Sequence, residues 1–229
     1  MRILAIDTSC GAASACVMEG GAETPIAGES LVMDRGHAEA LVPMLQRVVG
    51  AVEGGFPSLD RIVATTGPGS FTGIRIGLAT ARAIGLALSA PVVGVSTLAA
   101  FAAPLLAEPK PGLIAAAIDA RHGFLYLQLF EATGRPLVSP RLASVKEAAR
   151  AIGEGPARAA GSGAPLLAAQ AQAIGLTVEL AGEIAFPDIL WVARLGLAAE
   201  PSQSPPRPLY LKVPDAQRPE NAAVARAST

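Results

Sequence analysis

Residues Thr65-Thr66-Gly67-Pro68-Gly69-Ser70-Phe71-Thr72-Gly73-Ile74-Arg75-Ile76-Gly77 connect two segments with different apolar patterns. The β-branched run at 61–64 is typical of a strand, and the alanine-rich run at 78–88 is typical of a helix at that length and composition. The stretch between them is therefore predicted to be a strand-to-helix turn. Its glycines supply backbone freedom, and Ser70 or Thr72 is expected to cap the helix.

Two interpretations of this turn remain open. Such a turn aims several backbone N–H groups at one point, where a helix N-terminus favours an anion. The spacing excludes a P-loop, because Gly73 is followed by Ile74 and Arg75 instead of Lys and then Ser or Thr. It also departs from the dinucleotide fingerprint, because the last of its three glycines comes one residue too late. The turn is either a purely structural connection or an anion contact.

The helix predicted after the turn carries a small residue at every fourth position. These residues are Gly73, Gly77, Ala81, Gly85 and Ser89. They form one ridge with almost no side chains, although each glycine costs the helix about 1 kcal/mol relative to alanine. Close packing is the expected compensation. The ridge lies either against the protein's own sheet or a neighbouring helix, or against a second molecule, and both can hold because a helix has two sides.

The composition argues against a metal site and against a broad nucleic-acid-binding surface. The chain has 229 residues, a net charge of −1 and a pI of about 6.1, so it has no general basic field. The cysteines, Cys10 and Cys16, are expected to be reduced thiols in the first hairpin. His37 and His122 have no ligand-like spacing, so a zinc site is not expected. His37 is interpreted as a capping or packing residue at the start of a helix.

A long uncharged run at 83–107 raises the question of a membrane span. Pro91, Gly94 and Pro104 interrupt this run, and residues 92–95 are predicted to form a buried strand between two helices. No signal peptide is expected ahead of Met1. The prediction is a cytoplasmic protein that does not enter the membrane.

The first half of the chain is predicted to begin with three strands and a helix, followed by alternating strands and helices. The expected strands lie at 2–7, 11–18, 25–33, 61–64 and 91–95, and the expected helices at 41–52, 78–88 and 97–107. The first helix carries an apolar stripe formed by Leu41, Met44, Leu45, Val48, Val49 and Val52. With right-handed crossovers this order gives a mixed sheet covered by helices.

The second half repeats this outline after a linker at 108–112. The expected strands lie at 113–119, 123–131, 135–142 and 157–160, and the expected helices at 144–152, 166–174 and 187–200. Ser144 and Glu147 have the spacing of a capping box, and Trp191 is expected in the core. Residues 208–212 are expected to dock onto the body. Because Ala-Ile-Asp occurs at 5–7 and again at 117–119, the pattern indicates a duplication.

Several motifs resemble a single family. They are Ile-Asp-Thr-Ser at 6–9, Gly-His-Ala-Glu at 36–39 leading to Leu-Val-Pro at 41–43, the central segment at 67–77, and Tyr-Leu-Lys-Val-Pro-Asp-Ala at 210–216. Together they resemble the TsaB family, subunits of the bacterial machinery that makes threonylcarbamoyladenosine in tRNA. The resemblance implies an α/β fold of the duplicated ribonuclease H-like type found in actin, Hsp70 and sugar kinases, with two mixed-sheet subdomains and flanking helices. The first subdomain would cover 1–107 and carry partner-binding helices, a reduced second one would cover 108–214, and 215–229 would be a disordered tail.

The resemblance also implies a protein that is not an enzyme on its own. It would be a scaffold and dimerisation subunit that binds and activates the TsaD transferase, works with a TsaE-like ATPase, meets tRNA only through the complex, and forms a homodimer when alone. The implied partner interface comprises Leu41, Met44, Leu45, Val48, Gly73, Ile74, Gly77, Leu78, Ala81, Arg82 and Gly85. TsaD carries a His-x-x-x-His metal pair whose counterparts here are Thr97 and Phe101, so no metal cofactor is expected.

The rival prediction is a small ATP-binding phosphotransferase or ATPase of the same superfamily. Its nucleotide and magnesium contacts would be Asp7, Thr8, Ser9, Gly67, Gly69 and Ser70, which the scaffold interpretation treats as a vestigial nucleotide or anion contact. The second half offers only Gly161-Ser162-Gly163 as a phosphate loop, and no clear catalytic base is present, so no cofactor is expected. A metallopeptidase is the weakest alternative, because ligand-spaced histidines are missing.

Overall fold

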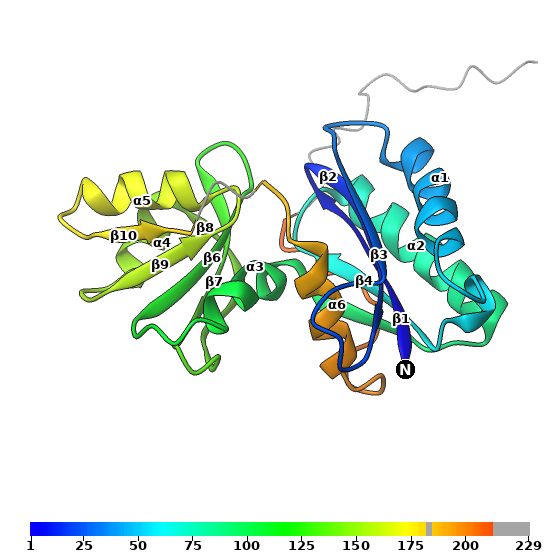
Figure 1. Ribbon diagram of the computed structural model, residues 1–229. Helices are drawn as coiled ribbons and strands as arrows, with labels where there is room; N and C mark the ends of the chain where they lie inside the picture. Colours follow the sequence, from blue (N-terminus) through cyan, green and yellow to red (C-terminus); the bar gives the residue numbers. More distant parts are fainter. Residues whose placement is uncertain (182–184, 213–229) are drawn as a thin grey trace, which may run out of the picture.

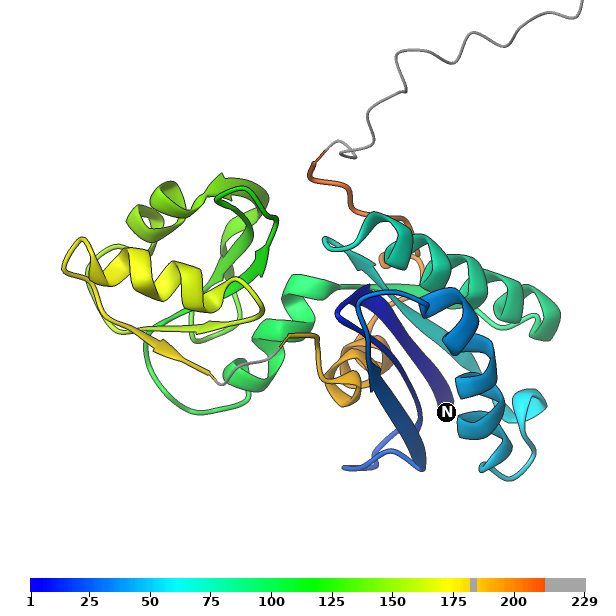
Figure 2. The same cartoon turned by 90° about the horizontal axis from the view of Figure 1, so that it is seen from above.

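The computed structural model describes residues 1–181 and 185–212 and consists of two lobes (Figure 1). Each lobe contains one five-stranded sheet. Helix α3 (Thr97–Leu106) lies between them, and the view from above shows the same separation (Figure 2). Leu98, Phe101 and Leu105 on this helix pack against the second sheet, while Ala100 packs with the first. One helix therefore joins the two cores.

The sheet of the first lobe has the strand order β3-β2-β1-β4-β5. Its strands are β1 (Arg2–Cys10), β2 (Ala12–Glu19), β3 (Ala27–Val32), β4 (Arg61–Gly67) and β5 (Val92–Ser96). The first three pair antiparallel, whereas β4 runs parallel to β1 and β5 parallel to β4. Because β1 is central and covered on both faces, it has a continuous apolar run instead of an alternating one.

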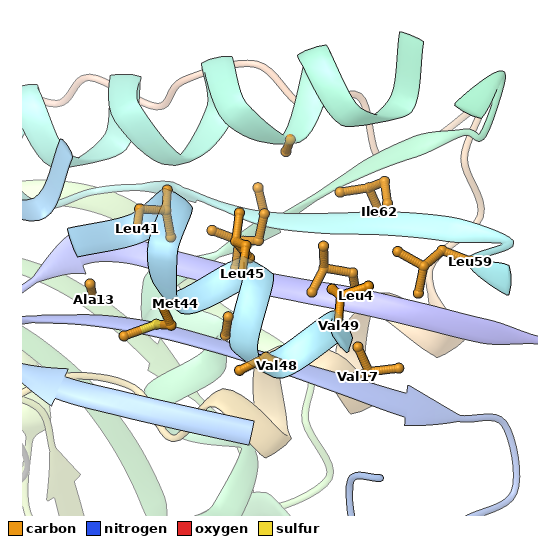
Figure 3. Close-up of a cluster of buried hydrophobic side chains, with 14 of the residues drawn as sticks. Leu4, Ala13, Val17, Leu41, Met44, Leu45, Val48, Val49, Leu59 and Ile62 are labelled. Atoms are coloured by element: carbon orange, nitrogen blue, oxygen red, sulfur yellow. The ribbon is translucent and has the colours of Figure 1, made fainter. Parts of the chain in front are cut away.

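Helices cover both faces of the first sheet. α1 (His37–Gly50) and α2 (Phe71–Leu88) lie on the face away from the second lobe, and α6 (Ile189–Ala198) lies on the other face (Figure 1). A short 3-10 helix, η1 (Phe56–Ser58), precedes β4. Figure 3 shows the apolar stripe of α1 lying together with side chains of the sheet such as Leu4 and Val17. The predicted stripe is thus part of the protein's own core.

The second lobe repeats the first in topology. Its elements are β6 (Leu113–Asp119), β7 (Phe124–Phe130), β8 (Pro136–Ser144), α4 (Val145–Ile152), β9 (Ala157–Ala160), α5 (Ala164–Gln172) and β10 (Val178–Leu180). The strand order β10-β9-β6-β7-β8 matches that of the first sheet, with the first three strands of each lobe antiparallel and the last two parallel. The predicted duplication is confirmed. β10 was not predicted, because three residues with one partner strand leave little pattern to detect.

Several elements begin or end at residues other than those predicted. β1 continues past Asp7 to Cys10, because Asp7 pairs with Ser14 and Cys10 with Ala12. α2 starts at Phe71, so much of the central motif is helical. The capping predictions are confirmed: the side chain of Ser70 accepts a hydrogen bond from the Gly73 amide, and Ser144 forms a complete capping box with Glu147.

The C-terminal part of the chain returns to the first lobe. α6 packs with Ile3 and Val63 of the first sheet, so the second lobe ends before residue 189 and not at 214 as predicted. Trp191 is half-buried beneath the guanidinium of Arg194, which corrects its assignment to the core. The sequence around α6 gives no sign of this packing, because a local pattern does not show which distant sheet a helix will contact. Residues 213–216 of the C-terminal motif and the predicted tail lie outside the described residues.

The uncharged run at 83–107 is divided among the end of α2, strand β5 and helix α3. By length and composition alone, α2 could span a membrane. Its Gly77 and Ala81, however, are buried against the first sheet. The buried apolar residues of the run belong to the cores of both lobes, which α3 joins.

Candidate functional site

The glycines of the central motif are required by packing against strand β1. A Cβ atom added at Gly69 would fall on the carbonyl oxygen of Ser9, and one added at Gly73 would fall on that of Thr8. At Gly77 the added atom would lie 2.6 Å from Thr8 Oγ1. The small-residue ridge of α2 therefore faces the protein's own sheet. The structure thus confirms the expectation that the ridge packs against the protein's own sheet.

This finding corrects the predicted partner interface. Most of its residues are buried in the first lobe: Leu41, Met44, Leu45, Val48, Gly73, Ile74, Gly77, Leu78, Ala81 and Gly85. Leu41 and Ala81 have no exposed surface at all. Side chains covered by their own sheet cannot contact a partner. Among the predicted interface residues, Arg82 is the exposed one.

The outward side of α2 is formed by different residues. Ala79, Ala83 and Leu86, here called the outer stripe, are exposed, and Leu86 is 84% accessible. At 100° per residue these three lie within about 60° of one another and roughly opposite Gly77 and Ala81. The stripe is therefore a narrow exposed strip of two alanines and one leucine, flanked on the same side of the helix by the exposed Arg75 and Arg82. On the neighbouring helix α1, Val42 is also exposed.

A C-terminal segment at 204–212, here called the strap, crosses from β5 to the start of α2. The Gly94 amide donates to the Ser204 carbonyl at 2.9 Å, and the Leu209 amide donates to the Thr66 carbonyl at 2.8 Å. Docking of residues 208–212 is confirmed. Sequence reasoning could not say where this segment docks, because its contacts are backbone groups on remote strands.

Two arginines of α2 hold the strap. Arg82 Nη2 donates to the Pro206 carbonyl at 2.5 Å, and Arg75 Nε donates to the Tyr210 hydroxyl at 3.1 Å. The Arg75 guanidinium also lies 3.7 Å from the centre of the Phe71 ring, which contacts the Tyr210 ring. Any molecule that binds the outer side of α2 near its start would thus meet the strap.

Asp7 is the centre of a buried polar network below the turn. Its Oδ1 accepts hydrogen bonds from Thr65 Oγ1 at 2.5 Å, Ser9 Oγ at 2.6 Å and the Ser9 amide at 3.0 Å. Thr97 Oγ1 extends the network to Ser9 Oγ at 3.1 Å. Oδ2 is buried and has no hydrogen-bond partner among the described residues. The carboxyl group ties β1, β4 and α3 together.

Burial raises the pKa of Asp7, and the hydrogen bonds from Ser9 and Thr65 oppose this rise only in part. A carboxyl whose pKa is higher in the folded state stabilises the fold at low pH, and this contribution is lost as the pH rises through the folded pKa. We therefore expect the unfolding free energy of Asp7→Asn, relative to the unchanged chain, to increase between pH 4 and pH 8. The increase should be about 1.4 kcal/mol per unit of pKa shift.

Urea denaturation at the two pH values measures this difference. A difference that does not change with pH would show that Asp7 is not desolvated in the folded protein.

A cleft of about 540 Å³ separates the two lobes at the ends of β1 and β6. Of the predicted nucleotide contacts, Ser9, Gly69 and Ser70 line it, whereas Asp7, Thr8 and Gly67 do not. The Ser70 amide, which a phosphate at this turn would need, donates instead to the Ser9 carbonyl at 2.8 Å. These contacts favour the structural interpretation of the turn over the anion interpretation.

On the second-lobe side of the cleft, the glycine turn at 161–163 also packs closely against a strand. A Cβ atom added at Gly161 would fall on the Ala117 carbonyl oxygen, and one at Gly163 would lie 2.9 Å from the Ile118 carbonyl carbon. Ser162 Oγ accepts a hydrogen bond from the Asp119 amide at 3.1 Å. Both glycine turns thus serve close approach to a strand, and neither needs a ligand to explain its composition.

His37 has a packing role. It is buried, and its Nε2 lies 3.1 Å from the Cys10 carbonyl oxygen, while Gly36 occupies the N-cap position of α1. Within residues 1–181 and 185–212, no group of three His, Cys, Asp or Glu residues is placed to hold a metal ion. Thr97 and Phe101 are both buried in α3.

Sequence reasoning missed other cleft residues. Arg121, Tyr126, Tyr210 and Lys212 line the cleft but were not predicted as site residues. Three of these residues, Arg121, Tyr210 and Lys212, belong to the sequence motifs at 119–121 and 210–216. Their juxtaposition, however, depends on the return of the chain to the first lobe.

Comparison with protein families gives one model that matches more than half of this chain. The model, described as TsaD, tRNA N6-adenosine threonylcarbamoyltransferase, matches residues 31–191, which include parts of both lobes.

Similar sequences include proteins named TsaB and an uncharacterized mycobacterial protein. Proteins named tRNA threonylcarbamoyladenosine biosynthesis protein TsaB are 34% identical over 126 residues in Escherichia coli and 32% identical over 131 residues in Bacillus subtilis. These alignments cover 55% and 57% of this chain and 53% and 56% of the relatives, so the chain spans about half the length of the TsaB relatives it matches. An uncharacterized protein of Mycobacterium tuberculosis is 32% identical over 224 residues, covering 94% of this chain and 93% of that protein.

Solved structures share the complete fold. A crystal structure of an uncharacterized protein with similarity to peptidase YeaZ from Pseudomonas aeruginosa superposes with a TM-score of 0.72 at 27% identity, and covers 92% of this chain and 99% of the other. A structure of YeaZ from the same species gives a TM-score of 0.67 with the same coverage and identity.

Proposed function

This chain belongs to the TsaD family of tRNA N6-adenosine threonylcarbamoyltransferases and resembles its TsaB relatives, and from this premise we propose that it works in the biosynthesis of threonylcarbamoyladenosine in tRNA. In this role it is a non-catalytic scaffold that binds a TsaD-like transferase and holds it in its active conformation. A TsaE-like ATPase joins the same assembly, tRNA is met through the complex, and the chain forms a homodimer when the transferase is missing. The assembly works in the cytoplasm.

The observation that carries the scaffold proposal is the outer stripe of α2. Leu86 is 84% exposed, and together with Ala79 and Ala83 it offers a small apolar strip between arginines on which a partner helix would pack. The small side chains of Ala79 and Ala83 would let a second helix approach closely, as ridges and grooves require. Val42 on α1 is a further exposed apolar side chain on the same pair of helices. The interface is thus proposed on the outward side of the same two helices whose inward sides form the core.

The internal use of the superfamily's polar groups supports a non-catalytic role. Asp7 accepts all its hydrogen bonds from Ser9 and Thr65 and does not reach the cleft. The Ser70 amide is bonded to β1. The presence of a cleft between the two lobes favours the rival function, an ATP-binding phosphotransferase or ATPase. Micromolar binding of ATP with magnesium by the isolated chain would support this rival.

Replacing Leu86 by aspartate tests the scaffold proposal. Because the side chain is already in water, the melting temperature should change by less than about 2 °C, whereas a charge at the centre of an apolar contact typically costs about 2 kcal/mol of binding or more. We expect affinity for the TsaD-like transferase of the same organism to fall at least about 30-fold. Co-purification of tagged chain and transferase, followed by calorimetric titration, measures the loss.

The matched control is Leu137→Asp, which places the same charge at a 47% exposed leucine on β8 of the other lobe. It should pair with the transferase as the unchanged chain does. Equal affinity for the unchanged chain, L86D and L137D would place the interface elsewhere. Failure of the unchanged chain to pair at all would overturn the scaffold proposal.

A further inference from the structure

The two sheets end in four edge strands, and three of these are protected against pairing with another chain. In the first lobe the strap covers β5, because the Gly94 amide donates to the Ser204 carbonyl at 2.9 Å. In the second lobe β8 contains Pro136 and Pro140 and shifts its register against β7, and β10 is only three residues long. Natural sheets use covering segments, prolines, bulges and short strands to prevent association through their edges.

The fourth edge strand, β3, has none of these features. It is six residues long, contains no proline, lysine or arginine, and pairs with β2 in an unbroken register. Its charged side chain, Glu29, is bonded to Arg47 of α1 at 2.6 and 2.9 Å. Among the described residues, no strand pairs with the outer side of β3, which lies at the edge of the first lobe (Figure 1). β3 is therefore an open edge.

The backbone of β3 presents hydrogen-bonding groups to its open side at every second residue. The Met33 amide donates to the Gly11 carbonyl at the start of β2, at 3.0 Å. In an antiparallel ladder the backbone groups of alternate residues point to the same neighbour. Because the register is unbroken, the N–H and C=O groups of Leu31 also point to β2. Those of Ser30 and Val32 then point outward, where a further strand would bond to them.

Two exposed apolar side chains lie on this edge, one on each face of the sheet. Leu31 is 45% accessible and Val32 is 70% accessible. Leu31 lies opposite Ala13, which belongs to the core beneath α1, so Leu31 is on the α1 face. Val32, as the next residue, is on the α6 face. A strand added to β3 would cover apolar surface on both faces and also bond the outward backbone groups.

We propose that β3 pairs antiparallel with β3 of a second copy of this chain, with Leu31 opposite Leu31 of that copy. In this register Ser30 exchanges both backbone hydrogen bonds with Val32 of the second copy, and Val32 with its Ser30. Glu29 lies opposite Met33. The symmetric registers centred on the two preceding residues are less favourable, because one places two carboxylates opposite each other and the other places Glu29 opposite Leu31. The strand is thus complementary to itself, which favours a second copy as the occupant.

This inference does not depend on the proposed function. Helix α2, which carries the outer stripe, packs on β1 and β4, whereas β3 lies at the sheet edge beside β2. Pairing through β3 uses none of the outer-stripe residues, so L86D should pair with itself as the unchanged chain does. Because the edge is short, the dimer is expected to be weak and reversible.

Sedimentation equilibrium of the full chain, from micromolar to millimolar concentration, measures the dimer. Leu31→Lys should weaken dimerisation at least about tenfold, because it replaces an apolar pair with two like charges directly opposite each other. The matched control is Leu137→Lys, which places the same charge at a 47% exposed leucine on the protected edge strand β8. It should change the dissociation constant less than about twofold.

A second pair of variants tests the backbone hydrogen bonds. Ser30→Pro removes an N–H group that points outward, so the bonds between β3 and β2 remain, and proline is tolerated at such positions of edge strands. Because the symmetric dimer loses this donor in both copies, dimerisation should weaken at least about tenfold. Ser30→Ala keeps the N–H group and should change dimerisation less than about twofold. If S30P loses its cooperative thermal transition, L31K against L137K decides the proposal.

Amide hydrogen exchange locates the contact. Exchange at Ser30 and Val32 should slow as the concentration of the chain rises, whereas exchange at Leu31 should be slow at every concentration. A chain that stays monomeric throughout, or a dimer that neither L31K nor S30P weakens, would overturn the proposal. So would slow exchange at Ser30 and Val32 only after the transferase is added, which would assign the edge to another protein. If the β3 dimer forms but the unchanged chain does not bind the transferase, the scaffold proposal alone fails.

Discussion

Replacing Gly73 by alanine is expected to destabilise the first lobe by roughly 3 kcal/mol or more. The added methyl group would fall on the carbonyl oxygen of Thr8 and lie 3.3 Å from the Ser70 Cβ. β1 cannot move away, because it is bonded to β2 on one side and β4 on the other. A separate hydrogen bond of 2.7 Å from Thr8 Oγ1 to the Gly73 carbonyl holds the helix in place. The clash must therefore displace α2, which covers one face of the lobe.

Gly50→Ala is the control for this prediction. Gly50 is the last residue of α1 and has no atom within 4 Å of the added Cβ position, so alanine should leave stability unchanged or raise it by up to about 1 kcal/mol. Urea denaturation followed by circular dichroism compares the two variants. Natural domains are stable by only about 5–15 kcal/mol, so the expected loss is a large share of the total. If G73A unfolds at the same urea concentration as G50A, α2 does not pack on β1 as described.

Replacing Gly94 by valine is expected to release the strap from the first lobe. A Cβ atom at this position would lie 2.5 Å from Thr66 Cγ2 and 2.8 Å from the Pro205 carbonyl oxygen. The strap is the more mobile of the two neighbours, because few hydrogen bonds hold it, and those at Gly94, Thr66 and Arg82 would break together. Loss of about 1.4 kcal/mol or more of docking free energy should raise the rate of chymotryptic cleavage after Tyr210 at least about tenfold.

Gly11→Ala is the control here, because the space around Gly11 is open. Mass spectrometry of the first cleavage products identifies the site. Equal rates of cleavage after Tyr210 in G94V and G11A would mean that the strap is not docked on β5. A variant that also loses the cooperative thermal transition would show that valine disrupts the sheet, and Gly94→Ala would then separate local from global effects.

The predictions that succeeded rest on local signals. The strand-to-helix turn at 67–70, the N-cap at Ser70 and the capping box of Ser144 with Glu147 each depend on residues within four positions of one another. The amphipathic stripe of α1 also repeats within a single helix. These features could be predicted because propensity, capping and periodicity act over a few residues.

The predictions that failed concern contacts between remote segments. The interface assigned to Leu41, Gly77 and Ala81 proved to be core, and α6 proved to belong to the first lobe. The candidate nucleotide contacts divided, because Gly69 and Ser70 line the cleft while Asp7 is buried against Thr65 and Ser9. Sheet order and register determine which face of a helix or strand packs against which other strand. A local sequence pattern specifies neither of them.

The sequence by itself determined that α2 has one side of small residues, that something must approach this side closely, and that the two halves share one outline. Only the tertiary structure decided what makes that approach. The backbone of Thr8 and Ser9, some sixty residues earlier in the chain, fills the ridge, because β1 is the central strand over which the helix crosses. With the ridge occupied, the opposite side of the helix is the one left exposed to solvent.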